Sequence, residues 1–157
     1  MCASPLLLAI ALALTTACAG RFAGITSGTY LCTPELTLNT CGVPISAMAQ
    51  ETELTGGGTD LLGLDLPGAV SREGFSNAPW QSIQLGAQAS PFEYHLGGTL
   101  GCGMSRFDFE QRSSVTRIAE DAIDLDHGFV FIGVAACGIA VDRCEVQYAV
   151  HCERVAP

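Results

Sequence analysis

The sequence CEVQYAVHCE, residues 144–153, indicates most clearly how this chain folds. Its even-numbered positions carry cysteine, valine and tyrosine, whereas its odd-numbered positions carry mostly charged and polar residues. A period of two puts one set of side chains on a buried face of a β-strand and the other set in water. Residues 144–153 therefore predict a half-buried strand of an antiparallel sheet.

The same alternation recurs in other parts of the chain. It is found at residues 35–39, 62–66, 92–104 and 107–110. Residues 129–136, FVFIGVAA, are apolar at nearly every position and predict a strand that is buried on both faces. The apolar positions change from even to odd near Ser105, and this change requires a bulge or a tight turn.

Turn-forming residues separate these predicted strands. Gly56-Gly57-Gly58, Pro67-Gly68 and Asp126-His127-Gly128 predict turns, and residues 69–91, which include the only tryptophan, predict a long irregular connection. We find no helical periodicity and expect an all-β domain of about eight to ten short antiparallel strands. A single barrel and a sandwich both fit this pattern, and the consecutive hairpins favour the barrel.

The N-terminal residues predict export. Residues 6–14 read LLLAIALAL and are followed by small residues up to Cys18. A short apolar run that ends in small residues is typical of a secretory signal, whereas a membrane span needs about 20 apolar residues. We therefore expect a signal peptide at residues 1–17 and a single domain at residues 18–157, which is large enough for one hydrophobic core.

Two cleavage sites fit the end of this signal. Residues 15–18, TTAC, resemble the lipobox of bacterial lipoprotein precursors. The resemblance implies that Cys18 is lipidated and becomes the first mature residue, and that Ala19 sorts the protein to the outer membrane. The alternative is ordinary signal-peptidase cleavage after Ala17-Cys18-Ala19, which would release a secreted protein that begins at Gly20.

The cysteines that follow the signal predict a disulfide framework. There are six of them: Cys32, Cys41, Cys102, Cys137, Cys144 and Cys152. Six cysteines in an exported domain of this size predict three disulfides, for which the sequence alone allows about 15 connectivities. Short candidate turns favour the pairs Cys32–Cys41 and Cys137–Cys144, which leaves Cys102–Cys152. A metal site is not indicated, because no C-x-x-C pair of the kind that binds zinc is present.

The composition excludes several classes of function. The chain carries 16 acidic residues, seven arginines and no lysine, which gives a formal net charge of −9. Without lysine it has neither a Schiff-base amine nor a lysine-lined phosphate site. Nucleic acids and anionic lipids attract clustered basic residues, so an acidic surface argues against both as electrostatic partners.

The strongest candidate for a metal site is a cluster of carboxylates near residue 120. Asp121, Asp124 and Asp126 lie close together in the sequence and precede Gly128. Calcium prefers oxygen ligands, and the spacing Asp-x-Asp-x-Gly is similar to part of a calcium loop, although the full EF-hand pattern is absent. The alternative is a solvated end of a hairpin.

Catalytic motifs are not evident. The three histidines, His95, His127 and His151, are all predicted at solvent-exposed positions, His127 in a turn. The sequence lacks the motifs of serine hydrolases, zinc proteases and nucleotide-binding loops, and a pair of carboxylates without known geometry has little specificity. We therefore predict no cofactor and no enzymatic activity.

One aromatic residue suggests a binding surface. Trp80 lies in the predicted irregular segment, where an exposed tryptophan could anchor a sugar or a partner, and packing against the domain is the alternative. The leading hypothesis is an exported protein that is anchored by a lipid on Cys18 at the outer membrane or in the periplasm, or is otherwise secreted. In this hypothesis it binds an envelope protein or ligand, or has a structural role. The other hypotheses are a hydrolase of envelope polymers that uses paired carboxylates and a calcium-stabilised adhesion module.

Overall fold

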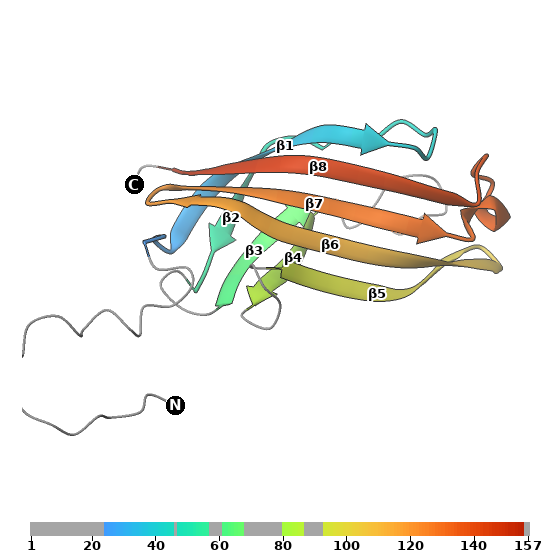
Figure 1. Cartoon of the computed structure of the whole chain (residues 1–157), viewed down its shortest axis with the longest axis horizontal. Coiled ribbons are helices and arrows are strands. Elements are labelled where there is room, and N and C mark those ends of the chain that lie inside the picture. Colours follow the sequence, from blue (N-terminus) through green and yellow to red (C-terminus); the bar gives the residue numbers. More distant parts are fainter. Residues whose placement is uncertain (1–23, 46, 57–60, 68–79, 87–92, 156–157) are drawn as a thin grey trace, which may run out of the picture.

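The computed structural model describes residues 24–45, 47–56, 61–67, 80–86 and 93–155 (Figure 1). These residues form strands almost throughout, with one short 3₁₀ helix, η1. The elements are β1 (Gly28–Asn39), β2 (Gln50–Leu54), β3 (Leu61–Pro67), β4 (Trp80–Gly86), β5 (Glu93–Cys102), β6 (Ser105–Ala119), β7 (Ala122–Ile132), η1 (Val134–Cys137) and β8 (Arg143–Arg154). The predicted all-β antiparallel fold is confirmed. Among the described residues, no helix has the length and hydropathy needed to cross a membrane.

The strands follow one another around a curled sheet. Six of them form one antiparallel sheet in the order β2-β1-β8-β7-β6-β5, and β3 and β4 form a second, smaller sheet. β8 returns to pair with β1, and an isolated bridge between Thr55 and Gly63 joins β2 to β3. β4 lies near β5 without forming a ladder with it. The strand order is thus that of an up-and-down barrel with an open seam between β4 and β5.

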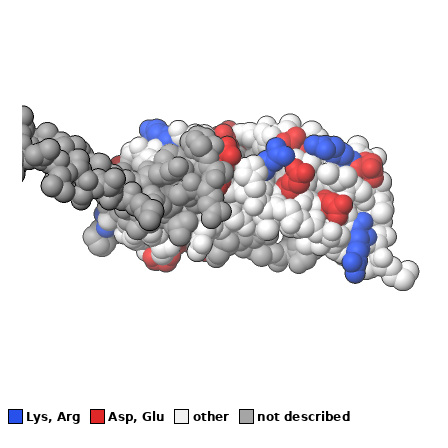
Figure 2. Space-filling view, turned by 60° about the horizontal axis from the view of Figure 1, so that its bottom comes forward, with Lys and Arg blue, Asp and Glu red and all other residues white. Residues whose placement is uncertain are grey.

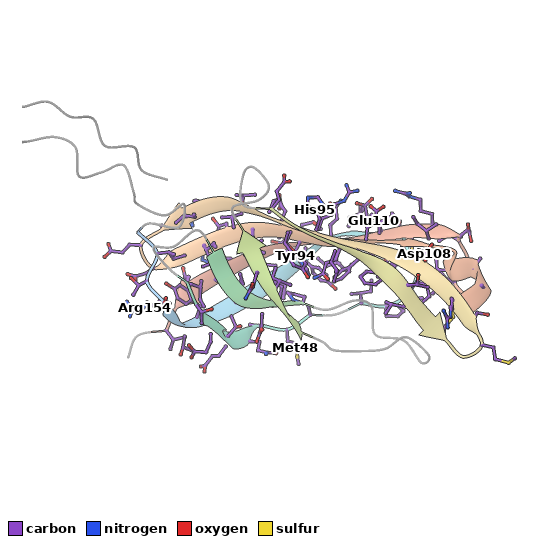
Figure 3. All side chains as sticks on the ribbon, turned by 90° about the horizontal axis from the view of Figure 1, so that it is seen from below. Met48, Tyr94, His95, Asp108, Glu110 and Arg154 are labelled. Atoms are coloured by element: carbon purple, nitrogen blue, oxygen red, sulfur yellow. A yellow bond between two sulfur atoms is a disulfide. The ribbon has the colours of Figure 1, made fainter. Side chains whose placement is uncertain are left out.

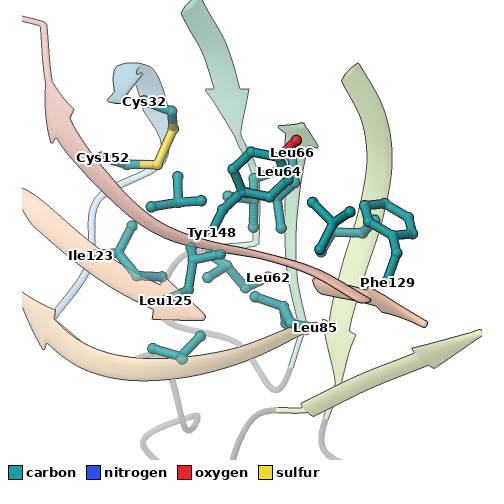
Figure 4. Packing of buried hydrophobic residues seen from close by; sticks show 14 of the residues in the cluster. Cys32, Leu62, Leu64, Leu66, Leu85, Ile123, Leu125, Phe129, Tyr148 and Cys152 are labelled. Atoms are coloured by element: carbon teal, nitrogen blue, oxygen red, sulfur yellow. A yellow bond between two sulfur atoms is a disulfide. The ribbon is translucent and has the colours of Figure 1, made fainter. Parts of the chain in front are cut away.

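The core lies inside this curl and follows the alternation seen in the sequence. On β8, Val146, Tyr148 and Val150 are buried, and the residues between them face outward. The two central strands β7 and β8 pair along nearly their whole length, so their inner side chains are covered on both sides. The small sheet covers the inner face with leucines from β3 and β4 (Figure 4). Burial of these apolar side chains is the main stabilising contribution.

The predicted pairing of the cysteines is wrong at all three bridges. The disulfides join Cys32 to Cys152, Cys41 to Cys144 and Cys102 to Cys137. The cause is the pairing of β1 with β8, which sets Cys32 directly opposite Cys152 with 4.0 Å between their Cα atoms. Spacing along the chain favours local pairs and does not indicate that the first and last strands are neighbours. All six cysteines are nevertheless in disulfides, as predicted.

Three predicted segments also differ from the structure. Asp126-His127-Gly128 is not a turn, because β7 continues through it, and the preceding hairpin turns at residues 120–121 instead. Residues 129–136 do not form one strand: the chain leaves β7 after Ile132 and enters η1 through Gly133, whose φ of 81° suits glycine. Residues 69–91 contain β4, which begins at Trp80.

The change of parity near Ser105 corresponds to a two-residue turn, as predicted. Gly103 and Met104 connect β5 to β6, with Cys102 opposite Ser105. Gly103 has a φ of 66°, a left-handed conformation that glycine adopts without steric cost. The turn places the alternating residues of both strands on matching faces of the sheet.

Candidate functional site

The outer face of the large sheet contains a pocket of about 410 Å³. The pocket crosses β5, β6, β7 and β8 and reaches β1, so its walls come from strands that are hydrogen-bonded to one another. Its outward-facing side chains are Thr37, Glu93, His95, Glu110, Arg112, Ser114, Asp126, Val130, Glu145 and Gln147, around the backbone of Gly128. We refer to this pocket as the outer-face groove.

Gly128 explains why the sheet is hollow at this point. It lies between Arg112 on β6 and Gln147 on β8 in the strand register. A Cβ atom at this glycine would lie 3.0 Å from the carbonyl oxygen of Val146. The strands therefore approach closely only because residue 128 has no side chain, and the longer side chains on both sides rise above it.

The groove is rich in carboxylates, and most of them have partners. Nη2 of Arg112 donates to Glu110 at 2.7 Å, and Nε2 of Gln147 donates to Glu145 at 2.6 Å. The imidazole of His95 lies 3.2 Å from Glu93. Acidic and basic side chains are accordingly interspersed over the face that is turned forward in Figure 2.

Asp126 differs from the other carboxylates of the groove. It is exposed on β7 and forms no hydrogen bond or ion pair with the described part of the chain. Its neighbours in the register are Ser114 on β6 and Ala149 on β8, both of them short residues. The carboxylate of Asp126 therefore stands accessible between short neighbouring side chains and retains its capacity to accept hydrogen bonds.

A second polar cluster lies further along the same face. Asp124 accepts hydrogen bonds from Nε of Arg117 and Nδ1 of His151, and Nε2 of His151 lies 3.0 Å from Glu153. Burial raises the pKa of Asp124, but the hydrogen bonds from His151 and Arg117 outweigh it and bring this pKa below its usual value. The hydrogen bonds from His151 to Glu153 and to Asp124 raise the pKa of the imidazole.

The predicted calcium ligands are not assembled into one site. The carboxylate of Asp124 is held by Arg117 and His151, and that of Asp121 lies 3.5 Å from Arg154. Within the described ranges, no group of three His, Cys, Asp or Glu side chains is arranged to hold a metal ion. Of the three, Asp126 faces the groove and has no partner among the residues that the structure describes.

The interior contains a buried histidine that the sequence analysis placed in an exposed turn. His127 is 2% exposed, and its Nε2 lies 2.6 Å from the carbonyl oxygen of Pro67 at the end of β3. Because that oxygen only accepts, Nε2 carries the proton, and Nδ1 accepts a hydrogen bond from Oγ of Ser113 at 2.6 Å. Burial lowers the pKa of His127 to about 4, so the ring is neutral at neutral pH.

The Ser113–His127 pair resembles a nucleophile and its base only in composition. Ser113 is 3% exposed, and the third group is the carbonyl of Pro67 instead of a carboxylate. A substrate has no access to this hydroxyl, and the hydrogen bonds join the large sheet to the small one. The alternation could have revealed His127, since Ile123, Leu125 and Phe129 occupy the same parity on β7.

Gln111 is another polar residue of the interior. It lies on the inner face of β6, opposite Leu96 on β5 and Phe129 on β7. It is 1% exposed, and neither its amide nitrogen nor its amide oxygen has a hydrogen-bond partner among the described residues. An unsatisfied buried amide is unfavourable by about 1–3 kcal/mol for each group, so Gln111 marks a position where a polar partner would be stabilising.

The remaining predicted site residues give less information. Cys18, the predicted lipidation site, lies outside the described residues. Trp80 begins β4, and its backbone lies opposite Pro67 on β3, but its side chain is outside the described part of the structure. The outer-face groove was not predicted, because it depends on strands that are distant in the sequence.

Comparisons of this chain with models of protein families, with curated proteins and with solved structures find no match in any of the three.

Proposed function

We propose that this chain is an exported protein of the cell envelope, anchored by a lipid on Cys18, that acts by binding and not by catalysis. In this proposal the outer-face groove receives a cationic group, such as a guanidinium, from a partner. The observation that carries the proposal is the accessible carboxylate of Asp126, which has no partner among the described residues, in a groove with three further carboxylates.

The disulfides support the part of the proposal that concerns export. Three disulfides are consistent with an extracellular or periplasmic protein, because thiols are kept reduced in the cytosol. Two of them link β1, or a residue just after it, to β8, and they hold the first and last strands of the chain together. A domain stabilised in this way suits an environment without cytosolic chaperones.

The chemistry of the groove supports binding of a cation. A guanidinium or ammonium group beside Asp126 would form charge-assisted hydrogen bonds, and at an exposed carboxylate such a pair stabilises by about 0.2–1 kcal/mol. The walls are paired strands, so little conformational entropy is lost when a ligand binds. The net charge of −9 would also accelerate association with a basic partner.

The anchor is tested by expression in a bacterial host beside a Cys18→Ala variant. Intact mass and membrane fractionation should show an acyl-modified, membrane-bound protein, and the variant should lose both properties. A soluble product that begins at Gly20 would contradict the anchor and leave the groove as the feature to be tested in a secreted protein.

The groove is tested by NMR titration of the folded Cys18→Ala chain with arginine amide. Backbone amide shifts should concentrate at Ser114 and Gly128, and Asp126→Asn should weaken the interaction by about 2- to 5-fold, as expected for an exposed ion pair. Glu51→Gln is the matched control, since it removes one exposed carboxylate from β2. Equal effects of the two substitutions would indicate attraction by net charge alone and would contradict a site.

A second candidate function is transport of an amphipathic ligand inside the curl. Gln111 favours it, because both of its amide atoms are buried without a partner in the described part of the chain, beside Leu96, which is 44% exposed. A fluorescent lipid analogue should then bind the protein, and Gln111→Leu should abolish this binding. If no analogue binds and Gln111→Leu only stabilises the fold, the amide is an unsatisfied core residue and the candidate fails.

A further inference from the structure

The last strand of the large sheet, β5, has one edge with which none of the described strands pairs. β5 pairs with β6 along its whole length, from Glu93 opposite Ser114 to Cys102 opposite Ser105. Its other edge faces the seam, and within the described residues no strand forms a ladder with it. Figure 3 shows this strand in front of the interior, with Tyr94 toward the inside of the curl and His95 on the outside.

The free edge is accessible to solvent along the middle of β5. Residues 95–99 are all exposed. Because Gly97 and Gly98 have no side chains, their exposure is exposure of the backbone itself. Natural sheets usually protect such an edge with lysine, proline or a bulge, and the sequence EYHLGGTLGC contains neither of these residues and pairs without a register shift.

The turn determines which backbone groups point to the seam. In a two-residue hairpin the flanking residues form a hydrogen-bonded pair, so the N–H and C=O of Cys102 point toward β6. The direction then alternates along the strand. The backbone groups of the odd-numbered residues, including His95, Gly97 and Thr99, therefore point to the free edge, while the even-numbered side chains face the interior.

We propose that the free edge of β5 pairs with the same edge of a second copy of this chain. The two strands run antiparallel about a two-fold axis at Gly98, so that each large sheet continues into the other. This register sets Leu96 opposite Leu100 of the second copy on the inner face. Odd residues lie opposite odd residues, so their outward N–H and C=O groups are matched as hydrogen-bonded pairs.

The sequence of β5 is self-complementary in this register. His95 lies opposite Gly101 of the second copy, and Gly97 lies opposite Thr99 of the second copy. The only charged residue, Glu93, lies beyond the end of the opposing strand, so no like charges face each other. The exposed side chain of Leu96 becomes covered, and this burial adds to the new ladder. Self-pairing is therefore favoured over an unrelated strand, whose side chains would have to match by chance.

The test uses the oxidised Cys18→Ala chain, which excludes association through a lipid. Sedimentation equilibrium from about 1 µM to 1 mM should show a monomer–dimer equilibrium. Gly97→Pro should raise the dissociation constant by about 30-fold or more, because it removes an outward donor from each copy and obstructs the edge. Gly97→Ala is the matched control and should dimerise normally, since its Cβ would lie 3.6 Å from the nearest atom, an ordinary contact.

Hydrogen exchange distinguishes edge pairing from other modes of association. The amides of His95, Gly97 and Thr99 should become protected as the dimer forms, whereas those of Leu96 and Gly98 are protected in the monomer as well. Leu96→Lys provides a second variant, because a charge at this half-exposed position leaves the monomer folded and opposes burial in the dimer.

Three outcomes would overturn the proposal. The first is a monomer over the whole concentration range. The second is a dimer that Gly97→Pro and Leu96→Lys leave intact. The third is protection of the odd-numbered amides only after addition of an envelope extract, which would assign the edge to a strand of another protein.

Discussion

His127 should make the fold sensitive to acid. The ring is 2% exposed, and burial lowers its pKa from 6.5 to about 4. Since the folded-state pKa lies below the unfolded value, the unfolded chain binds the additional proton first. Stability is therefore lost as the pH falls from about 6.5 to 4, and the full loss is about 3 kcal/mol. At pH 5 the same relation gives about 2 kcal/mol.

The test replaces His127 by glutamine, which can still donate to the carbonyl of Pro67 but has no imidazole to protonate. The variant should be less stable than the wild type near pH 7.5, because it loses the packing of the ring against Phe129 and Tyr148. Urea unfolding with the disulfides intact should show that the wild type loses about 2 kcal/mol more than the variant between pH 7.5 and pH 5. His95→Gln, at an exposed histidine, is the control.

The reasoning would be refuted by parallel pH profiles for the wild type and His127→Gln. It would also be refuted by an NMR titration in which the ring of His127 protonates near pH 6.5 in the folded protein. Either result would mean that the charged imidazole is accommodated at the junction of the two sheets, contrary to the burial of His127.

Three further predictions concern the outer face and the disulfides. His151 has a raised pKa, so its stabilising contribution is present below about pH 6.5 and is lost as the pH rises through the folded pKa. In urea titrations, His151→Gln should therefore destabilise the protein by about 0.5 kcal/mol at pH 5.5 and by less at pH 8.5. A destabilisation that grows with pH would contradict this prediction. Gly128→Ala should destabilise the protein by about 1–3 kcal/mol, because the added Cβ would lie 3.0 Å from a backbone oxygen. Gly97→Ala should have little effect on stability, since its Cβ would make only ordinary contacts. Similar melting temperatures for the two variants would refute the steric argument. Replacing Cys32 and Cys152 together by alanine should lower the free energy of unfolding by about 3 kcal/mol, because the bridge Cys41–Cys144 remains and leaves a loop of roughly 18 residues for Cys32–Cys152 to close. A loss below about 1 kcal/mol would show that the pairing of β1 with β8 constrains the chain without this bridge.

The local patterns of the sequence were sufficient for the fold class and for most of the strands. The alternation at residues 144–153 correctly predicted β8, and the parity change near Ser105 correctly predicted the hairpin between β5 and β6. At His127 two local signals conflict, because Asp-His-Gly is a good turn sequence whereas the apolar neighbours of the same parity, Ile123, Leu125 and Phe129, indicate a continuing strand. The segment 69–91 concealed β4 for a related reason: a short strand between glycines and prolines carries a weak signal.

The outer-face groove and the free edge of β5 could not be predicted from the sequence. The groove combines Asp126 and Gly128 with residues of four other strands, and its shape depends on how closely β7 and β8 approach each other at Gly128. A strand edge is free only when no other strand pairs with it, and a local sequence pattern does not indicate which strands pair. The sequence thus indicated binding in general terms, and the three-dimensional arrangement identified the surfaces on which to test it.

The sequence by itself determined which residues face the core, because alternation of side chains along a strand is a local property of the backbone. It also determined that the six cysteines form disulfides, since their number and the predicted export suffice for that inference. Only the tertiary structure decided which cysteines bond and which strand remains unpaired. These features depend on β8 returning to β1 and on the seam between β4 and β5, which are contacts between distant segments that no local pattern specifies.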